Sequence, residues 1–342
     1  MSVAHQLLFG YDGGHRLLAG SRELPADTLL LLQGATDAAM NADSPALVTA
    51  VALPAADEYA FCVTWPAPEM PRAGAVWGHV LLVSAADLGD AGHFQALLGL
   101  PRRPLDAASD LASYNSPLDL GAPTGVSLEQ LAPLASDRDV LERIVAAVYG
   151  SSDSAVCVHP DLAAGTRAML AVWSGQWPKL RAGFSFRTRE LFRASPSSFD
   201  LTVAAKVSGG GAVAPAAEAE RTPRWVAAIV EDLLTNARTP LREFLWTFGP
   251  DGAPDRVALR RLAKLWTRVA AGDPTRVRNY LERRWPERSG GDLKYALFGA
   301  GQDRWWALDE RTRVRTLVHA GGDAWDRDGL ELKRRARALG IR

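Results

Sequence analysis

Imidazole, carboxylate and guanidinium groups gather near the start of the chain. His5, Asp12, His15 and Arg16 lie there, and His79 and His159 follow further along the sequence. Imidazole and carboxylate groups together could bind a metal ion or transfer protons. A metal- or histidine-dependent hydrolase or nuclease, with His15 as general base or metal ligand, is therefore one hypothesis.

The chain lacks the motifs by which such enzymes are usually recognised. It has no nucleophile elbow, Walker A motif, HExxH motif, paired CxxC motifs or dinucleotide-binding fingerprint. The spacing of the histidines carries little information, because only folding could bring them together. We therefore favour a binding function and predict no catalytic residue, no metal ligand and no cofactor.

A predicted β-hairpin positions the first group of side chains. Apolar residues alternate along residues 7–11, and Asp12-Gly13-Gly14 supplies residues that tolerate a positive φ. This pattern predicts two antiparallel strands joined at residues 12–14. His15 and Arg16 leave the turn together, which suits hydrogen bonding and anion pairing. A surface turn also tolerates both residues without any binding role.

Two later motifs combine aromatic and basic residues. The β alternation of residues 76–82 puts Trp77 and His79 on one face. In residues 184–189, Arg187 and Arg189 share a strand face and could bind phosphate or carboxylate groups. The alternative for Trp77 and His79 is that they pack in the core without binding a ligand. The alternative for the two arginines is that they are solvated on an exposed face of the sheet.

We predict that polar and aromatic residues of these segments line one ligand-binding cleft. Their roles would be hydrogen bonding, ring stacking and pairing with anions. The predicted ligand-binding residues are His5, Gln6, Tyr11, Asp12, His15, Arg16, Trp77, His79, Trp177, Arg181 and Arg187.

Runs of strand length and runs of helical periodicity are interspersed before residue 207. The predicted strands, besides the hairpin, are 46–53, 59–65, 75–84, 155–159, 182–188 and 199–205. The predicted helices are 25–39, 90–100, 127–135, 137–149 and 161–173. The opening hairpin and the mixed order indicate an α+β fold, with a mixed, largely antiparallel sheet and flanking helices.

The composition changes near residue 207. Residues 207–220 contain three consecutive glycines and an Ala/Pro/Glu-rich run, which is typical of a linker or a long surface loop. We predict an α+β recognition domain at 1–206, this linker or loop at 207–220, and a basic, all-α helical domain at 221–342. The helices expected after the linker are 223–236, 240–248, 256–271, 274–285, 292–298 and 310–319.

The formal net charge of zero hides an asymmetry between the two halves. Residues 1–220 carry 14 Lys and Arg against 23 Asp and Glu, whereas residues 221–342 carry 25 against 16. Opposite charges suggest either that the halves attract one another or that each binds a different charged partner. Nucleic acid is a possible partner but is not favoured, because few aromatics interleave with the arginines of the predicted last helix, at 333–337.

Hydropathy and cysteine usage indicate the compartment. The sequence has no apolar run of the ~18 residues that a membrane-spanning helix needs, so we expect no membrane association. Cys62 and Cys157 lie in apolar runs without CxxC spacing, which suits buried thiols in a reducing compartment. We therefore expect a cytoplasmic protein.

Several separated segments resemble the N-terminal domain family of GTPase-associated proteins from bacterial conflict systems. They are residues 5–21, 64–65, 72–81 and 173–188. The resemblance implies a non-GTPase adaptor in a multi-protein anti-phage defence assembly, with a neighbouring GTPase or effector protein as partner and no established catalytic activity. The chain departs from the family pattern at Gly78, where a hydroxyl-bearing residue is expected, and at Lys179, where arginine is expected.

Overall fold

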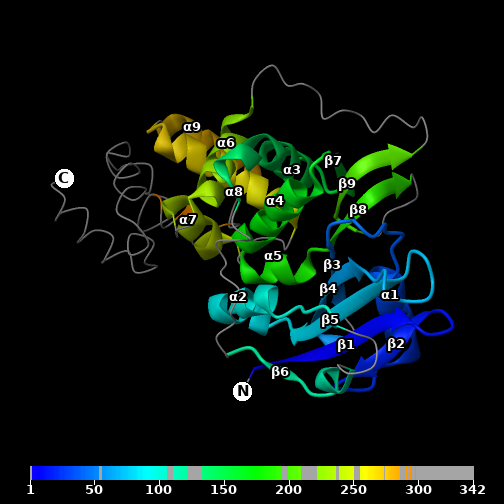
Figure 1. Ribbon diagram of the computed structural model, residues 1–342. Helices are drawn as coiled ribbons and strands as arrows, with labels where there is room; N and C mark the ends of the chain where they lie inside the picture. The colour runs from blue at the N-terminus through cyan, green and yellow to red at the C-terminus, as the bar shows by residue number, and fades with distance from the viewer. Residues whose placement is uncertain are drawn as a thin grey trace. The chain divides into compact units, whose positions relative to one another are not determined.

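The structure is a computed structural model (Figure 1). It describes residues 2–53, 56–105, 111–121, 133–193, 199–208, 222–235, 239–249, 255–272, 274–285, 290, 293–294 and 297. The chain forms two compact units, one of Met1–Val148 and Asp153–Ala217, the other of Tyr149–Ser152 and Glu218–Arg342. The predicted boundary between the α+β recognition domain and the linker, after residue 206, stays a prediction.

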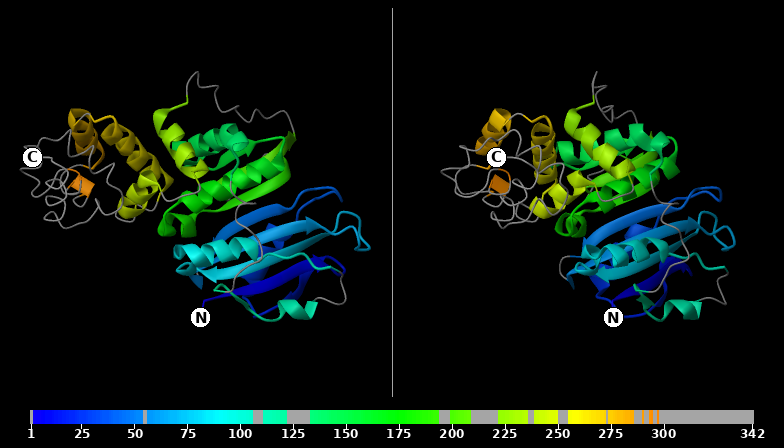
Figure 2. Two further views of the ribbon diagram at one scale, coloured as in Figure 1. Left: turned by 60° about the vertical axis from the view of Figure 1, so that its left-hand side comes forward. Right: turned by 90° about the vertical axis from the view of Figure 1, so that its left-hand side faces the viewer.

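A mixed sheet is the centre of the first unit. Its strands are β1 (Val3–Tyr11), β2 (His15–Gly20), β3 (Leu47–Leu53), β4 (Glu58–Pro66), β5 (Val76–Ser84), β6 (Leu118–Asp119), β7 (Ala155–Val158), β8 (Phe186–Arg193) and β9 (Leu201–Ser208). The strand order is β2-β1-β5-β4-β3-β8-β9-β7, and β6 pairs with β1. Pairing is antiparallel from β2 to β8 and parallel between β8, β9 and β7 (Figures 1 and 2). The predicted α+β fold with a largely antiparallel sheet is confirmed.

Helices and short 3-10 turns flank this sheet. They are α1 (Ala26–Thr36), η2 (Asp87–Gly89), α2 (Ala91–Gly99), η3 (Leu111–Tyr114), η5 (Ala135–Asp137), α3 (Arg138–Gly150), α4 (Leu162–Gly175) and α5 (Pro178–Gly183). Two of the longer helices begin at capping aspartates, since Asp90 accepts a bond from the His93 N–H and Asp161 from the Ala164 N–H. Such caps satisfy amide groups that a helix N-terminus leaves unpaired.

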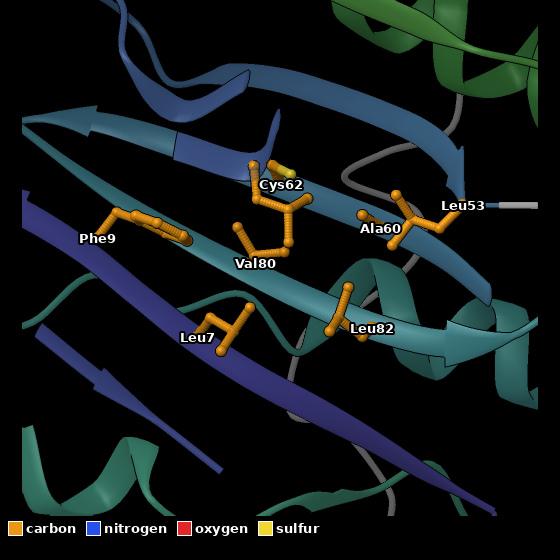
Figure 3. Packing of buried hydrophobic residues seen from close by; sticks show 8 residues of the cluster. Leu7, Phe9, Leu53, Ala60, Cys62, Val80 and Leu82 are labelled. Atoms are coloured by element: carbon orange, nitrogen blue, oxygen red, sulfur yellow. The ribbon is translucent and has the colours of Figure 1, made fainter. Parts of the chain in front are cut away.

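Apolar residues are buried on both faces of strands β1, β4 and β5. On one face, Leu7, Phe9, Leu53, Ala60, Cys62, Val80 and Leu82 pack together with Leu32 of α1 (Figure 3). On the other, Leu8, Trp77 and Tyr114 belong to a second cluster. Because successive strand residues point to opposite faces, Gln6 shares the face of Leu8, whereas His5 shares that of Leu7.

Four helices make up most of the described part of the second unit (Figures 1 and 2). They are α6 (Arg224–Leu234), α7 (Pro240–Phe248), α8 (Arg256–Ala270) and α9 (Pro274–Arg284). α8 packs against α6, α7 and α9. Within the described residues, no helix is both long enough and apolar enough to cross a membrane.

The structure corrects two local predictions and leaves others untested. The helix predicted at 25–39 ends at Thr36, because Asp37 already has an extended backbone. Ala182 and Gly183 belong to α5, and β8 begins only at Phe186, so the strand predicted at 182–188 starts too early. Pro178 at the start of α5 favours the helix, because its fixed φ suits a first turn. Val207 and Ser208 end β9, while the rest of the predicted linker lies outside the described residues. Also outside the described residues lie the predicted helix at 310–319, the basic segment 333–337 and most of the predicted helices at 127–135 and 292–298.

Candidate functional site

The N-terminal hairpin ends in the predicted turn. Tyr11 pairs with His15, and the Asp12 N–H donates to the carbonyl oxygen of Gly14 at 2.9 Å. Gly13 adopts a φ of 68°, a conformation that glycine tolerates without strain. Asp12 and Arg16 form an exposed ion pair across the turn. An exposed pair of this kind contributes little to stability and leaves both side chains open to a partner.

A cleft of about 700 Å³ lies beside this turn. Its walls come from the hairpin, the end of α1 with the segment after it, the segment before β5, and β8. The lining residues are Tyr11, His15, Gln33, Asp37, Ala38, Ala39, Met40, Asn41, Arg72, Ala73, Gly74, Ala75, Val76, Glu190 and Leu191. Tyr11 and His15 are the two of the eleven predicted ligand-binding residues that line this cleft.

Hydrogen bonds hold His15 in one orientation. Its Nε2 lies 2.9 Å from Thr36 Oγ1, and that hydroxyl is placed to donate to the Leu32 carbonyl oxygen at 3.0 Å. Because the Thr36 hydroxyl proton is used in this bond, Thr36 Oγ1 acts as the acceptor toward His15. His15 therefore carries its proton on Nε2 and donates it to Thr36 Oγ1, while Nδ1 remains an acceptor. Gln33 Nε2 also donates to the His15 carbonyl oxygen at 2.6 Å, which fixes the backbone of the turn to α1.

Burial keeps the His15 imidazole neutral. Desolvation lowers the pKa of His15, and the nearby carboxylate of Asp37 acts in the opposite direction. A neutral imidazole with a free Nδ1 accepts a hydrogen bond from a ligand at neutral pH.

Charges of both signs line the cleft. Asp37 and Glu190 contribute carboxylates, whereas Arg72 contributes a guanidinium 5.6 Å from the centroid of the Tyr11 ring. A cation over an aromatic face is attracted by the ring electrons, which orients the Arg72 side chain. The cleft therefore offers hydrogen-bond donors, acceptors and an aromatic surface, a combination suited to recognition.

Gln6, Trp77 and His79 are buried away from solvent instead of lining the cleft. His79 Nδ1 accepts from the Arg102 N–H at 3.1 Å, so Nε2 carries the proton and donates to Gln6 Oε1 at 3.1 Å. Burial lowers the pKa of His79 to about 3, with a smaller contribution from Arg102. Trp77 Nε1 donates to Glu69 at 2.6 Å. Internal partners thus satisfy the polar groups that we predicted to bind a ligand.

Trp177 and Arg181 belong to another buried cluster, around α4 and α5. Arg181 donates to the carbonyl oxygens of Leu88 at 2.7 Å, Ser174 at 2.9 Å and Gln176 at 3.0 Å. Its guanidinium also lies 4.1 Å from the centroid of the Phe94 ring. Both Trp177 and Arg181 are at most 1% exposed, so their position suits holding the α4–α5 junction together.

The remaining predicted residues have separate surroundings. Arg187 lies 4.7 Å from the Phe199 ring, and its Nε is 3.4 Å from Thr202 Oγ1. His5 Nδ1 lies 3.2 Å from Ser21 Oγ. The structure therefore does not bring the eleven predicted residues together at one site.

The histidines do not converge either. His5, His15 and His79 have different hydrogen-bond partners, and His159 Nδ1 contacts its neighbouring main chain at Asp161. In the part of the chain that the structure describes, no group of three or more His, Cys, Asp and Glu side chains could hold a metal ion. The geometry thus offers the hydrolase hypothesis no observation in its favour.

Five polar residues of the cleft are not among the predicted site residues: Gln33, Asp37, Asn41, Arg72 and Glu190. A partial signal exists for Arg72, which lies in a segment that resembles the family. Asp37 lies inside the helix predicted at 25–39, whereas α1 ends at Thr36 and leaves Asp37 beside the cleft. Glu190 comes from β8, and no local pattern shows that β8 lies near the hairpin.

The fold and the cleft define an α+β protein with a candidate recognition site beside its N-terminal hairpin. Residues 3–100 match the family of GTPase-associated protein 1, N-terminal domain type 1. This match over the N-terminal part of the chain supports the resemblance that the sequence motifs indicate. The matched segment includes β1 to β5, α1 and α2, and supplies most of the cleft lining. Neither the comparison with curated proteins nor that with solved structures returned a match.

Proposed function

We propose that this chain is a non-catalytic adaptor, the recognition subunit of a bacterial GTPase-associated conflict system that acts against phage. Its partner is a neighbouring GTPase or effector protein, and it works in the cytoplasm. The single observation that carries the proposal is the mixed-charge cleft, most of whose lining comes from the segment that matches the GTPase-associated family.

Each cleft group has a role in partner recognition. Arg72 pairs with a carboxylate of the bound segment, and Asp37 and Glu190 accept bonds from its cationic or amide groups. His15 accepts a hydrogen bond at Nδ1 while Thr36 holds the other ring nitrogen. Charges at an interface of this kind contribute more to specificity and association rate than to affinity.

Affinity capture tests this proposal. The intact chain is used to capture the proteins encoded beside it, in the presence of GTP, of GDP and of no nucleotide. We expect capture of the GTPase or its effector that depends on the nucleotide and is lost in His15→Ala or Arg72→Ala.

Arg187→Ala is the matched control, because Arg187 is a strand arginine that does not line the cleft. Capture that is equal in all variants would contradict the role of the cleft. Failure to capture any encoded neighbour in any nucleotide state would contradict the adaptor function itself.

A further inference from the structure

The described part of the second unit contains a dense cluster of cations on α8 and α9. Its members, called the α8–α9 cation cluster here, are Arg260, Arg261, Lys264, Arg268 and Arg284. Among the described residues, none of the five forms an ion pair with a carboxylate. This differs from the other unit, where Arg16, Arg22 and Arg103 each have a carboxylate partner.

Three of these cations follow one line along α8. Arg260, Lys264 and Arg268 are each separated by four residues, so they lie on one side of the helix. The rise between successive members is about 6 Å, because an α-helix rises about 1.5 Å per residue. All three are half-buried beside the apolar core of the unit. Arg260 also donates to the Gly150 carbonyl oxygen and Arg268 to that of Lys264, and each guanidinium keeps further N–H donors for a ligand.

Aromatic residues fix the orientation of two members. The Arg268 guanidinium carbon lies 4.2 Å from the Tyr280 ring centroid, and Lys264 Nζ lies 5.9 Å from the Trp225 ring centroid. Tyr280 also donates to the Arg261 carbonyl oxygen at 3.3 Å, which connects α9 to α8. A row of cations held in this way loses less side-chain entropy when it binds a polyanion.

The positive charges are close enough to affect one another. Burial lowers the pKa of Lys264, and Arg260, Arg268 and Arg284 act in the same direction. Repulsion between unpaired cations is relieved when an anionic ligand binds between them.

We propose that the α8–α9 cation cluster binds the phosphate backbone of a nucleic acid. The regular spacing of the cations favours a nucleic-acid strand, in which single negative charges repeat evenly. An acidic protein surface is a poorer match, because its carboxylates have no fixed repeat. Guanidinium groups also bind phosphate oxygens bidentately. The inference concerns the second unit and is independent of partner capture by the cleft of the first.

A salt titration with the full chain tests it. The probe is a fluorescein-labelled 20-nucleotide single-stranded DNA of mixed sequence, and fluorescence anisotropy gives the dissociation constant at a series of NaCl concentrations. We expect affinity to fall steeply with salt, by about 0.7 log units per log unit of salt for each phosphate contact.

Lys264→Gln with Arg284→Gln removes two contacts. This double variant should weaken binding roughly tenfold and reduce the salt slope by about 1.4, twice the single-contact value. Arg143→Gln with Lys179→Gln is the matched control, because it removes two exposed positive charges outside the cluster and should leave both quantities unchanged. Equal thermal midpoints of the variants establish that all are folded.

Three outcomes would overturn the proposal. One is the absence of binding at low salt, and the second is equal loss of binding in the cluster variant and its control. In the third, poly-glutamate displaces the labelled DNA as well as the unlabelled oligonucleotide does at the same concentration of negative charge. This result would assign the cluster to an acidic protein partner.

Discussion

His79 of β5 donates a hydrogen bond from Nε2 to Oε1 of Gln6 on β1 at 3.1 Å, and both side chains are fully buried. Gln6 Nε2 in turn donates to the carbonyl oxygens of Ser113 at 2.9 Å and Ser116 at 2.5 Å. The pair therefore connects the sheet to the segment around η3. A motif that resembles a ligand site in sequence thus serves as an internal polar network.

Gln6→Ala tests this assignment. The truncation leaves the His79 N–H and two carbonyl groups without their partner, and each unsatisfied buried group costs about 1–3 kcal/mol. We expect the free energy of unfolding, measured by urea denaturation, to fall by about 2–4 kcal/mol. His5→Ala on the same strand is the control and should cost under about 1 kcal/mol, because His5 is partly exposed. Equal losses in both variants would refute a network centred on Gln6.

Stability should depend on pH through His79. Its pKa is about 3 in the folded chain, below the ordinary histidine value of 6.5, so between these values the unfolded chain binds a proton that the folded chain does not. The free energy of unfolding therefore falls as the pH drops below about 6.5, by up to about 1.4 kcal/mol per pH unit from this group. Urea denaturation between pH 7 and pH 5 should show a smaller slope for His79→Gln than for the unmodified chain. Identical slopes would show that His79 is not buried in its neutral form.

Gly78 of β5 lies against Thr36 of α1. A Cβ built on Gly78 would lie 2.5 Å from the Cβ of Thr36, far inside normal contact. We expect Gly78→Ala to lower the free energy of unfolding by about 1–3 kcal/mol, the usual range for overpacking. It should also displace Thr36 and so perturb the His15 ring, which NMR of the His15 side chain would detect. Gly14→Ala has open space around its Cβ and should leave both readouts nearly unchanged.

This contact also explains the departure from the family pattern at Gly78. A hydroxyl-bearing residue at this position would collide with Thr36 in the present arrangement. The Thr36 hydroxyl supplies a polar group at this strand–helix contact and holds His15.

Arg181 should behave as a structural residue. Arg181→Met removes the donor to three buried carbonyl groups and should lower the free energy of unfolding by at least about 3 kcal/mol. Lys179→Met, two residues earlier on α5, is exposed and should have little effect. A stable Arg181→Met chain that had lost only partner capture would show instead that Arg181 contacts the partner.

Local sequence patterns predict much of the first unit. The apolar alternation before Asp12-Gly13-Gly14 specifies the hairpin, and Asp90 and Asp161 mark the starts of α2 and α4. The parallel pairing of β8 with β9 and of β9 with β7 has no local signature, because strand periodicity does not specify which strands pair or in which direction. For the same reason Glu190 could not be placed near His15 before the fold was known.

The candidate site is less predictable than the fold. A polar residue in an apolar strand has the same pattern whether it binds a ligand or an internal partner, so Gln6 and His79 resemble site residues in the sequence. Their burial depends on the segment around Ser113, which is distant in the chain. Tyr11 and His15 do line the cleft, because they adjoin an exposed turn whose position follows from the glycines. Whether they bind a ligand stays a prediction.

Amide hydrogen exchange of the intact chain, alone and bound to the protein that it captures, tests whether the cleft is the site of recognition. We expect slower exchange on binding in residues 11–15, 37–41 and 72–76, which line or adjoin the cleft. Residues 155–158 of β7 provide the internal reference. Unchanged exchange in the three cleft segments, with protection confined to other parts of the chain, would contradict the cleft as the site of recognition.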